Sequence, residues 1–250
     1  MTIEVNNIES LRKKRREGIT FFVPCLNEEK DIANTLNTIK TAVDKVGIEY
    51  EVLVFDDCSN DNSVSQIKDF GKVNPDMPII LIEKMKTMGL GHNYADGSYI
   101  AEYMYYMIIF GDNSTTVEII KSSLINLGEA EIIIPYFNQK HRPFFRRLLS
   151  VSFTFLVNLL SNNSIHYYNW SVVHLTNNVM RWHSDSHGFG FQAELITRLL
   201  DDGATYFEFE GKAHFKKEQS SALKFKNIAS VSHSLLQVLL RKLRKAILDK

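Results

Sequence analysis

The sequence predicts an α/β protein in which helices flank a mostly parallel sheet. Strand-like and helix-like segments alternate through the first half of the chain, which is the pattern of a sheet covered on both faces. The strand-like segments are continuous apolar runs, as expected for buried parallel strands. Acidic residues follow several of these runs, and the clearest example is Asp56-Asp57 after Val52-Leu53-Val54-Phe55.

The expected elements follow one another along the chain. Apolar runs predict strands at Thr20–Val23, Glu51–Phe55, Ile79–Glu83, Tyr106–Phe110, Ala130–Pro135 and Thr205–Phe209. Helical periodicity predicts helices at Asp31–Val46, Ser63–Val73, Gly91–Tyr103, Thr116–Asn126, Pro143–Ser161, Phe189–Leu200 and Ile228–Leu248.

Two of the later helices are predicted to be amphipathic. The helix over Pro143–Ser161 gathers its apolar residues on one side, namely Phe144, Leu148, Val151, Phe155 and Leu159. The last helix is apolar on one side and basic on the others. It fits either a helix packed on the core or on a second subunit, or one that lies on a membrane surface.

Length and composition limit the class of protein. A chain of 250 residues with 44% hydrophobic and 23% charged residues forms a globular domain with a substantial core. The formal net charge of zero gives no indication of a nucleic-acid partner. The start of the chain has no signal-peptide pattern, and its longest apolar stretch, Leu148–Leu160, is shorter than the roughly 20 residues of a spanning helix.

We therefore expect a soluble or peripheral cytoplasmic protein. Its expected parts are a basic lead-in over residues 1–17, a catalytic domain over 18–222 and a basic amphipathic helix over 223–250.

Three loops are expected to meet at the carboxyl edge of the sheet. Pro24–Glu28 follows the first strand, Asp56-Asp57 the second, and Gly111-Asp112-Asn113-Ser114 the fourth. Open α/β sheets bind ligands at this edge. Because acids repel a phosphate, Mg²⁺ or Mn²⁺ is the natural bridge to a phosphate-bearing ligand. The stretch Gly89-Leu90-Gly91 before a helix would let the backbone approach a pyrophosphate.

The motifs, taken in order, resemble family 2 glycosyltransferases of the GT-A fold. Within that family the chain is most similar to dolichyl-phosphate mannosyltransferase and related polyprenyl-phosphate sugar synthases. The resemblance covers roughly residues 18 to 230. It is carried by Val23–Glu29, Phe55–Ser63, Gly89–Gly91, Gly111–Asn113, Arg142 with Arg147, Tyr167–Asn169 and Gly188–Glu194.

The resemblance implies a role for each matching residue. Pro24, Asn27, Glu28, Gly89 and Gly91 would line the nucleotide-sugar pocket. Asp56 would bind the base with Asp57 beside it, and Asp112 with Asn113 would hold the metal on the donor diphosphate. Two positions depart from the family pattern: Phe110 replaces the first acid of the Asp-x-Asp motif, and the late basic motif survives only loosely around Lys217.

The reaction implied is transfer of a sugar from a UDP- or GDP-sugar to a lipid-phosphate or glycan acceptor, generally with inversion. A phosphate acceptor is already a charged nucleophile, and Arg142, Arg146 and Arg147 would position it. A hydroxyl acceptor requires a carboxylate base, for which Glu194 is the first candidate and Asp185 the second. The simpler interpretations are a solvated helix start for the arginines and a salt-bridged helix residue for Glu194.

Other classes of protein remain as alternatives. A non-catalytic nucleotide-sugar-binding or scaffold protein is the main one, because the Asp-x-Asp motif is incomplete. A zinc site at His183 and His187 would need a helix where Ser, Asp and Gly188 favour a loop. A dinucleotide-binding enzyme would need a Gly-rich fingerprint after the first strand, and Pro24–Glu28 has none. Peripheral membrane contact and a homo-oligomer are both compatible with the sequence.

Overall fold

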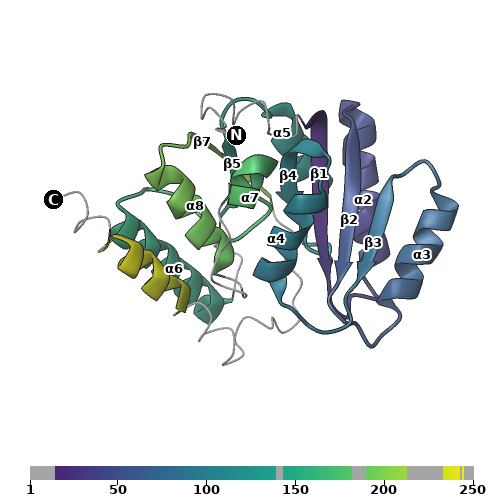
Figure 1. Ribbon diagram of the computed structural model, residues 1–250, viewed down its shortest axis with the longest axis horizontal. Helices are drawn as coiled ribbons and strands as arrows, with labels where there is room; N and C mark the ends of the chain where they lie inside the picture. Colours follow the sequence, from purple (N-terminus) through teal and green to yellow (C-terminus); the bar gives the residue numbers. More distant parts are fainter. Residues whose placement is uncertain are drawn as a thin grey trace, which may run out of the picture.

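The apolar runs form one seven-stranded sheet in a computed structural model of the chain (Figure 1), which describes residues 15–138, 143–181, 188, 190–212, 233–242 and 244. The strand order is β3-β2-β1-β4-β6-β5-β7. Only β6 runs antiparallel to its neighbours β4 and β5, and the other neighbouring strands pair in parallel. The strands are β1 (Arg16–Cys25), β2 (Tyr50–Asp56), β3 (Ile79–Glu83), β4 (Tyr103–Ile108), β5 (Ile132–Phe137), β6 (Val173–Leu175) and β7 (Tyr206–Gly211).

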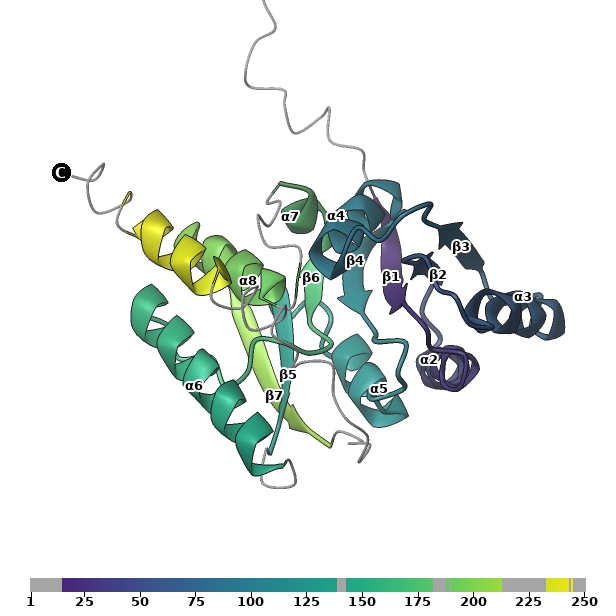
Figure 2. The same ribbon diagram turned by 90° about the horizontal axis from the view of Figure 1, so that it is seen from below.

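Helices cover both faces of this sheet, so the predicted fold class is confirmed (Figure 2). Alternate residues of each strand point to opposite faces. Phe21 and Val23 of β1 accordingly pack with α2, α3 and α5, whereas Phe22 packs with α4, α6, α7 and α8. The helices are α2 (Ile32–Val46), α3 (Ser63–Val73), α4 (Leu90–Ile100), α5 (Val117–Ile125), α6 (Phe144–Ser161), α7 (Thr176–Arg181) and α8 (Phe191–Asp201), and residues 233–242 are also helical.

The structure differs from the sequence prediction around Tyr103. The predicted helix over 91–103 ends at Ile100, and β4 begins at Tyr103 rather than at Tyr106. Tyr103 pairs with Arg16 of β1, and the Arg16 guanidinium lies 5.0 Å from the centre of the Tyr103 ring. This long-range pairing outweighs the local helical pattern.

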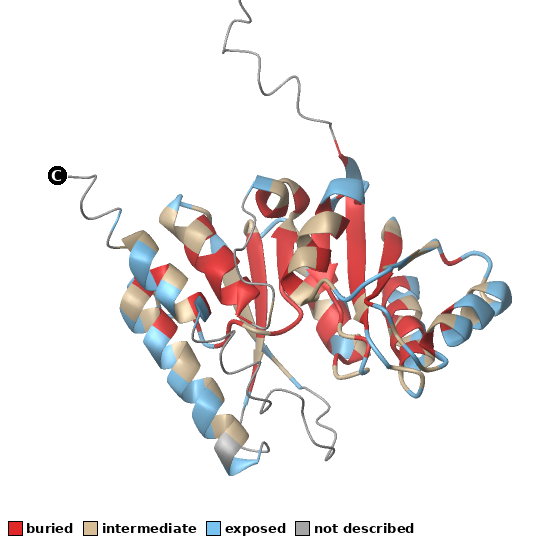
Figure 3. Ribbon diagram, turned by 60° about the horizontal axis from the view of Figure 1, so that its bottom comes forward, coloured by how far each residue is buried: buried red, intermediate tan, exposed pale blue. Residues whose placement is uncertain are grey.

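The helix α6 forms where it was predicted, but most of its apolar side chains are exposed. Figure 3 shows exposed residues along much of this helix. Val157 and Ser161 are the buried positions of α6 among those whose side chains are described. We call the exposed set the apolar face of α6, and it consists of Phe144, Leu148, Leu149, Val151, Phe155, Leu156 and Leu159.

The helix over 233–242 lies against α8 and beside α6 (Figures 1 and 2). Arg241 donates hydrogen bonds to Asp201 and Thr197 of α8, and Leu235 packs in the same cluster as Val157. The inner side of this helix is therefore packed on the core, which agrees with the expectation of a packed terminal helix. Among the described residues, none of the helices combines the length and the apolar character that crossing a bilayer requires.

Candidate nucleotide-sugar site

The predicted site lies at the topological switch point of the sheet. From β1 the chain first adds β2 and then β3 on one side, and then returns to add β4 on the other side of β1. Parallel pairing puts the carboxyl ends of these strands at one edge, with Cys25 opposite Asp56 and Asp56 opposite Glu83. Ligands of open α/β sheets bind in the crevice that such a reversal opens.

The loops that follow β1 and β2 are joined by reciprocal hydrogen bonds. The amide of Asn27 donates to Ser59 Oγ over 2.9 Å, and the amide of Asn60 donates back to Asn27 Oδ1 over 2.9 Å. The amide of Glu28 donates to Ser63 Oγ over 2.8 Å, and the amide of Glu29 to an Asp61 carboxylate oxygen over 3.0 Å.

These four hydrogen bonds hold the loop after β1 and the loop after β2 together as one unit. Asn27 has a positive φ of 60°, a conformation that asparagine tolerates better than most residues. The hydrogen bonds that Ser59, Asp61 and Ser63 accept from the loop after β1 were not predicted from the sequence. The dense run of Ser, Asn and Asp after Cys58 was the available signal, since these side chains hydrogen-bond nearby backbone.

Asp56 is the most deeply buried acid of the site. Its side chain is 3% exposed, and Oδ2 accepts a hydrogen bond from the Ser59 amide over 3.0 Å. The second oxygen, Oδ1, is buried and accepts no hydrogen bond from the part of the chain that the structure describes. A buried acceptor without a partner is costly and calls for a donor from elsewhere.

Asp57 organises the segment that leads into α4. Oδ1 accepts from the Met88 amide and from Asn93 Nδ2, each over 2.8 Å, while Oδ2 accepts from the Gly89 amide over 3.0 Å. Gly89 has a φ of 91°, which requires glycine. The sequence predicted that the backbone of Gly89–Gly91 approaches a pyrophosphate, and in the structure the Gly89 N–H donates to Asp57. Gly91 lies buried in the first turn of α4.

The turn over residues 111–113 touches the loop after β1. A Cβ at Gly111 would lie 2.8 Å from the Pro24 carbonyl oxygen and 3.3 Å from Glu28 Cγ, so only glycine allows this approach. Helix α2 anchors the turn, because Thr35 donates to the Gly111 carbonyl over 2.9 Å. Asp112 is exposed, and one of its oxygens accepts from the Ser114 amide over 3.0 Å.

These residues fit a metal that arrives with a diphosphate better than a metal held by protein ligands alone. No group of three or more His, Cys, Asp or Glu side chains within the described ranges is placed to hold an ion. Mg²⁺ commonly binds one or two carboxylates together with phosphate oxygens and water, and the exposed Asp112 can supply one carboxylate. Asn113 Oδ1 instead accepts from Thr38 Oγ1 over 3.0 Å.

Cys25 is the last residue of β1, and Cys58 follows the acidic pair at the end of β2. Both thiols are free, with Cys25 buried and Cys58 exposed. Burial raises the pKa of the Cys25 thiol to about 12, and the nearby carboxylates of Asp56 and Glu28 act in the same direction. The Cys25 thiol is therefore protonated near neutral pH.

The remaining candidates lie beyond β4. Glu194 is fully buried in α8, and its carboxylate is paired with Arg198 Nη2 over 2.7 Å. The Arg147 guanidinium lies 5.8 Å from the centre of the Phe144 ring in α6. Arg142, Lys217, Asp185 and the two histidines at 183 and 187 lie outside the described residues.

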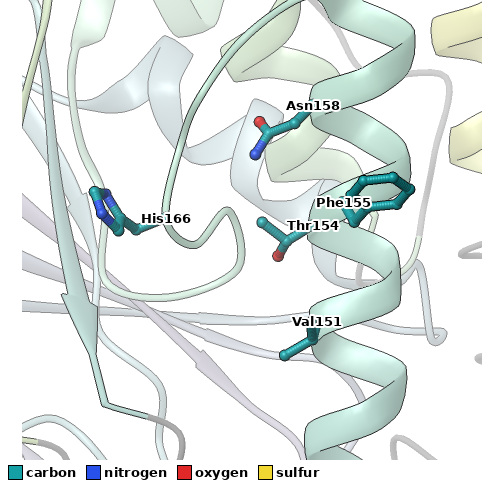
Figure 4. A pocket seen from close by; sticks show the side chains of 5 residues that line it. All are labelled: Val151, Thr154, Phe155, Asn158 and His166. Atoms are coloured by element: carbon teal, nitrogen blue, oxygen red, sulfur yellow. The ribbon is translucent and has the colours of Figure 1, made fainter.

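A separate cavity of about 260 Å³ lies between α6 and the loop that follows it (Figure 4). Val151, Thr154, Phe155, Asn158 and His166 line this cavity. None of the residues predicted for the nucleotide-sugar site takes part in it.

The fold is that of an α/β protein of the GT-A type, and the loops after β1, β2 and β4 meet at the switch point of its sheet. Residues 20–115 match the family model described as Glycosyl transferase family 2. This segment holds the β1, β2 and β4 loops, and its match confirms the resemblance to family 2 glycosyltransferases that the motifs indicated.

Solved structures share the fold over almost the whole chain. Glucosyl-3-phosphoglycerate synthase from Mycobacterium tuberculosis, in complex with Mn²⁺, UDP and phosphoglyceric acid, matches with a TM-score of 0.68 at 13% identity. The match covers 97% of this chain and 83% of that one. The complex of the same enzyme with Mg²⁺ and UDP has a TM-score of 0.67 at 12% identity, covering 97% and 84%. At such identity the likeness establishes the fold.

Proposed function

We propose that this protein transfers a sugar from a nucleoside-diphosphate sugar to a phosphate-bearing acceptor, specifically a polyprenyl phosphate at the cytoplasmic face of a membrane. The observation that carries the proposal is the convergence of three loops at the switch point. The proposal is supported by two carboxylates at this sheet edge: Asp56, whose buried Oδ1 has no hydrogen-bond partner among the described residues, and the exposed Asp112.

The donor would lie across this edge. Uracil and guanine each carry a ring N–H that can donate to Asp56 Oδ1, which supplies the missing partner. Asp112 would hold Mg²⁺ or Mn²⁺ on the diphosphate, and the bound metal would neutralise charge that develops on the leaving group. The similar synthase was solved with UDP and either Mn²⁺ or Mg²⁺, which supports this donor class.

The state of Glu194 supports a phosphate acceptor over a sugar hydroxyl. A general base must reach the proton that it removes, and a carboxylate that is fully buried and paired with Arg198 does not present itself to a hydroxyl. A phosphate ester is already ionised and needs no such base. In this mechanism Glu194 is a structural residue of α8.

The position of α6 supports a role for its first arginines in binding this acceptor. Strand β5 runs parallel to β4, since both are antiparallel to β6, and it therefore ends at the same sheet edge as Asp112. Helix α6 begins shortly after that end, with Arg146 and Arg147 in its first turn. Guanidinium groups bind phosphate oxygens in a bidentate geometry, so we assign these residues to the acceptor phosphate.

Calorimetry of UDP-glucose and GDP-mannose, with and without Mn²⁺, tests donor binding, and mass spectrometry with a short polyprenyl phosphate tests transfer. We expect metal-dependent binding of one donor and one glycosylated lipid product. The variant Asp112→Ala should lose the metal dependence. Asp56→Asn should bind the donor about 10- to 100-fold more weakly, because it loses a charge-assisted hydrogen bond.

Asp76→Ala is the matched control, because Asp76 is exposed and precedes β3 at the opposite edge of the sheet. It should behave as the unaltered chain. Transfer at an unchanged rate by Asp112→Ala would refute the metal role. Absence of both metal-dependent binding and product would favour a scaffold protein with a degenerate site.

A further inference from the structure

We propose that the apolar face of α6 is a contact surface for an anionic lipid bilayer, with the helix lying in the boundary between headgroups and acyl chains. The inference extends the proposed function, because a polyprenyl phosphate is presented at a bilayer. It rests on the surface of α6 itself, and its test does not depend on turnover.

The orientation of α6 is the first observation. A surface helix normally turns its apolar stripe to the core and its polar residues to water. In α6, Phe144 and Phe155 are each 63% exposed and Leu159 is 65% exposed, whereas the inward positions include Ser161 and Asn158. Contiguous exposed apolar patches on soluble proteins mark an interaction site.

The charges around this face indicate which partner covers it. Helix α6 contains no acidic residue, and its two charged residues are Arg146 and Arg147. The neighbouring helix over 233–242 also has no acidic residue and exposes Leu236, Leu239 and Leu240. An exposed apolar face on a helix that carries cations and no acid is the composition of helices that lie on anionic membranes.

A second copy of the chain would be a poorer partner. Two-fold pairing of this face would bring Arg146 and Arg147 of both copies into the same interface, with no acid on α6 to pair with them. An anionic bilayer supplies the complementary charge.

The position of α6 relative to the site is the third observation. The helix begins at the sheet edge that carries Asp112, as described above for β5. The cavity of about 260 Å³ opens along the same helix, and Val151 and Phe155 belong both to its lining and to the apolar face. A bilayer in contact with α6 would therefore hold lipid headgroups near the sheet edge at which this helix begins.

Vesicle flotation of the full chain tests whether the apolar face of α6 binds a bilayer. We expect most of the protein to float with vesicles that contain phosphatidylglycerol and little of it to float with vesicles of phosphatidylcholine alone. The triple variant Leu148→Gln, Phe155→Gln and Leu159→Gln should lower the bound-to-free ratio about 10-fold or more, because it removes much of the apolar area. These side chains are exposed, so the unfolding midpoint should be preserved.

The matched control changes three apolar residues that are exposed elsewhere, as Val73→Gln, Met85→Gln and Ile125→Gln. It should float like the unaltered chain. Equal flotation of the α6 variant and this control would overturn the proposal. So would a chain that stays unbound and forms a dimer that the α6 variant dissolves, since a second copy would then be the partner.

Donor calorimetry on the same proteins separates this proposal from the proposed function. Both triple variants should bind the nucleotide-sugar as the unaltered chain does. Donor binding without flotation would refute the bilayer surface alone, and flotation without donor binding would refute the sugar-transfer function alone.

Discussion

The replacement Asp57→Asn tests whether this acid organises the segment before α4. The carboxylate accepts three hydrogen bonds, two at Oδ1 and one at Oδ2. An amide can keep its oxygen toward Met88 N and Asn93 Nδ2, but its NH₂ then faces the Gly89 N–H, donor against donor. Loss of one charge-assisted bond costs about 1.5–3 kcal/mol, and the other two bonds weaken to neutral ones.

We therefore expect the free energy of unfolding to fall by about 3 kcal/mol, which is more than a 100-fold change in the folded-to-unfolded ratio. Urea unfolding followed by circular dichroism measures the change, and hydrogen exchange should accelerate at the Met88 and Gly89 amides. The control Asp69→Asn removes an exposed ion pair with Lys72 and should cost less than about 1 kcal/mol. Equal losses in the two variants would refute the reasoning.

Other predictions concern two helix glycines and a buried histidine. Gly97→Ala should destabilise the fold by about 1–3 kcal/mol, since a Cβ there would lie 2.2 Å from the Tyr106 hydroxyl oxygen. Gly71→Ala has open space around it and should stabilise α3 by about 0.5–1 kcal/mol. Urea unfolding measures both changes, and reversed signs would contradict both predictions. Burial lowers the pKa of His174 from 6.5 to about 3, so the unfolded chain binds a proton that the folded chain excludes and stability is lost as pH falls below about 6.5. Between about pH 7.5 and about pH 5 this histidine should account for about 2 kcal/mol of that loss, and an equally steep pH dependence in His174→Phe would exclude it as the cause.

Elements with a strong local pattern were predictable from the sequence. β3 has the bounds that its apolar run indicates, and α6 begins one residue after the predicted start at Pro143. β6 was missed because a three-residue strand between β4 and β5 has almost no periodicity of its own. The amphipathic pattern of α6 predicted a helix but could not say which face turns inward, because that depends on the neighbouring elements.

The site was predictable as a set of loops and less so as a set of contacts. Strand ends identified Asp56 and Asp112 as residues of one sheet edge, and the topology agrees. The partners of Asp57 lie 31 to 36 positions further along the chain, so no local pattern shows that its oxygens are engaged. The burial of Glu194 follows from how α8 packs, which residue spacing alone does not give.

The short antiparallel strand β6 joins two parts of the sheet, β1 to β4 and β5 with β7, that evolution can exchange separately. Three residue pairs join it to β4, two join it to β5, and the segment that matches the family model ends before β5 begins. A recombination boundary between α5 and β5 would leave the block of β1 to β4 intact while a different block of β5 to β7 is attached. Chimeras that exchange residues 130–212 between relatives should then retain donor preference and change acceptor preference, provided that the incoming block brings a strand of equal length for β4.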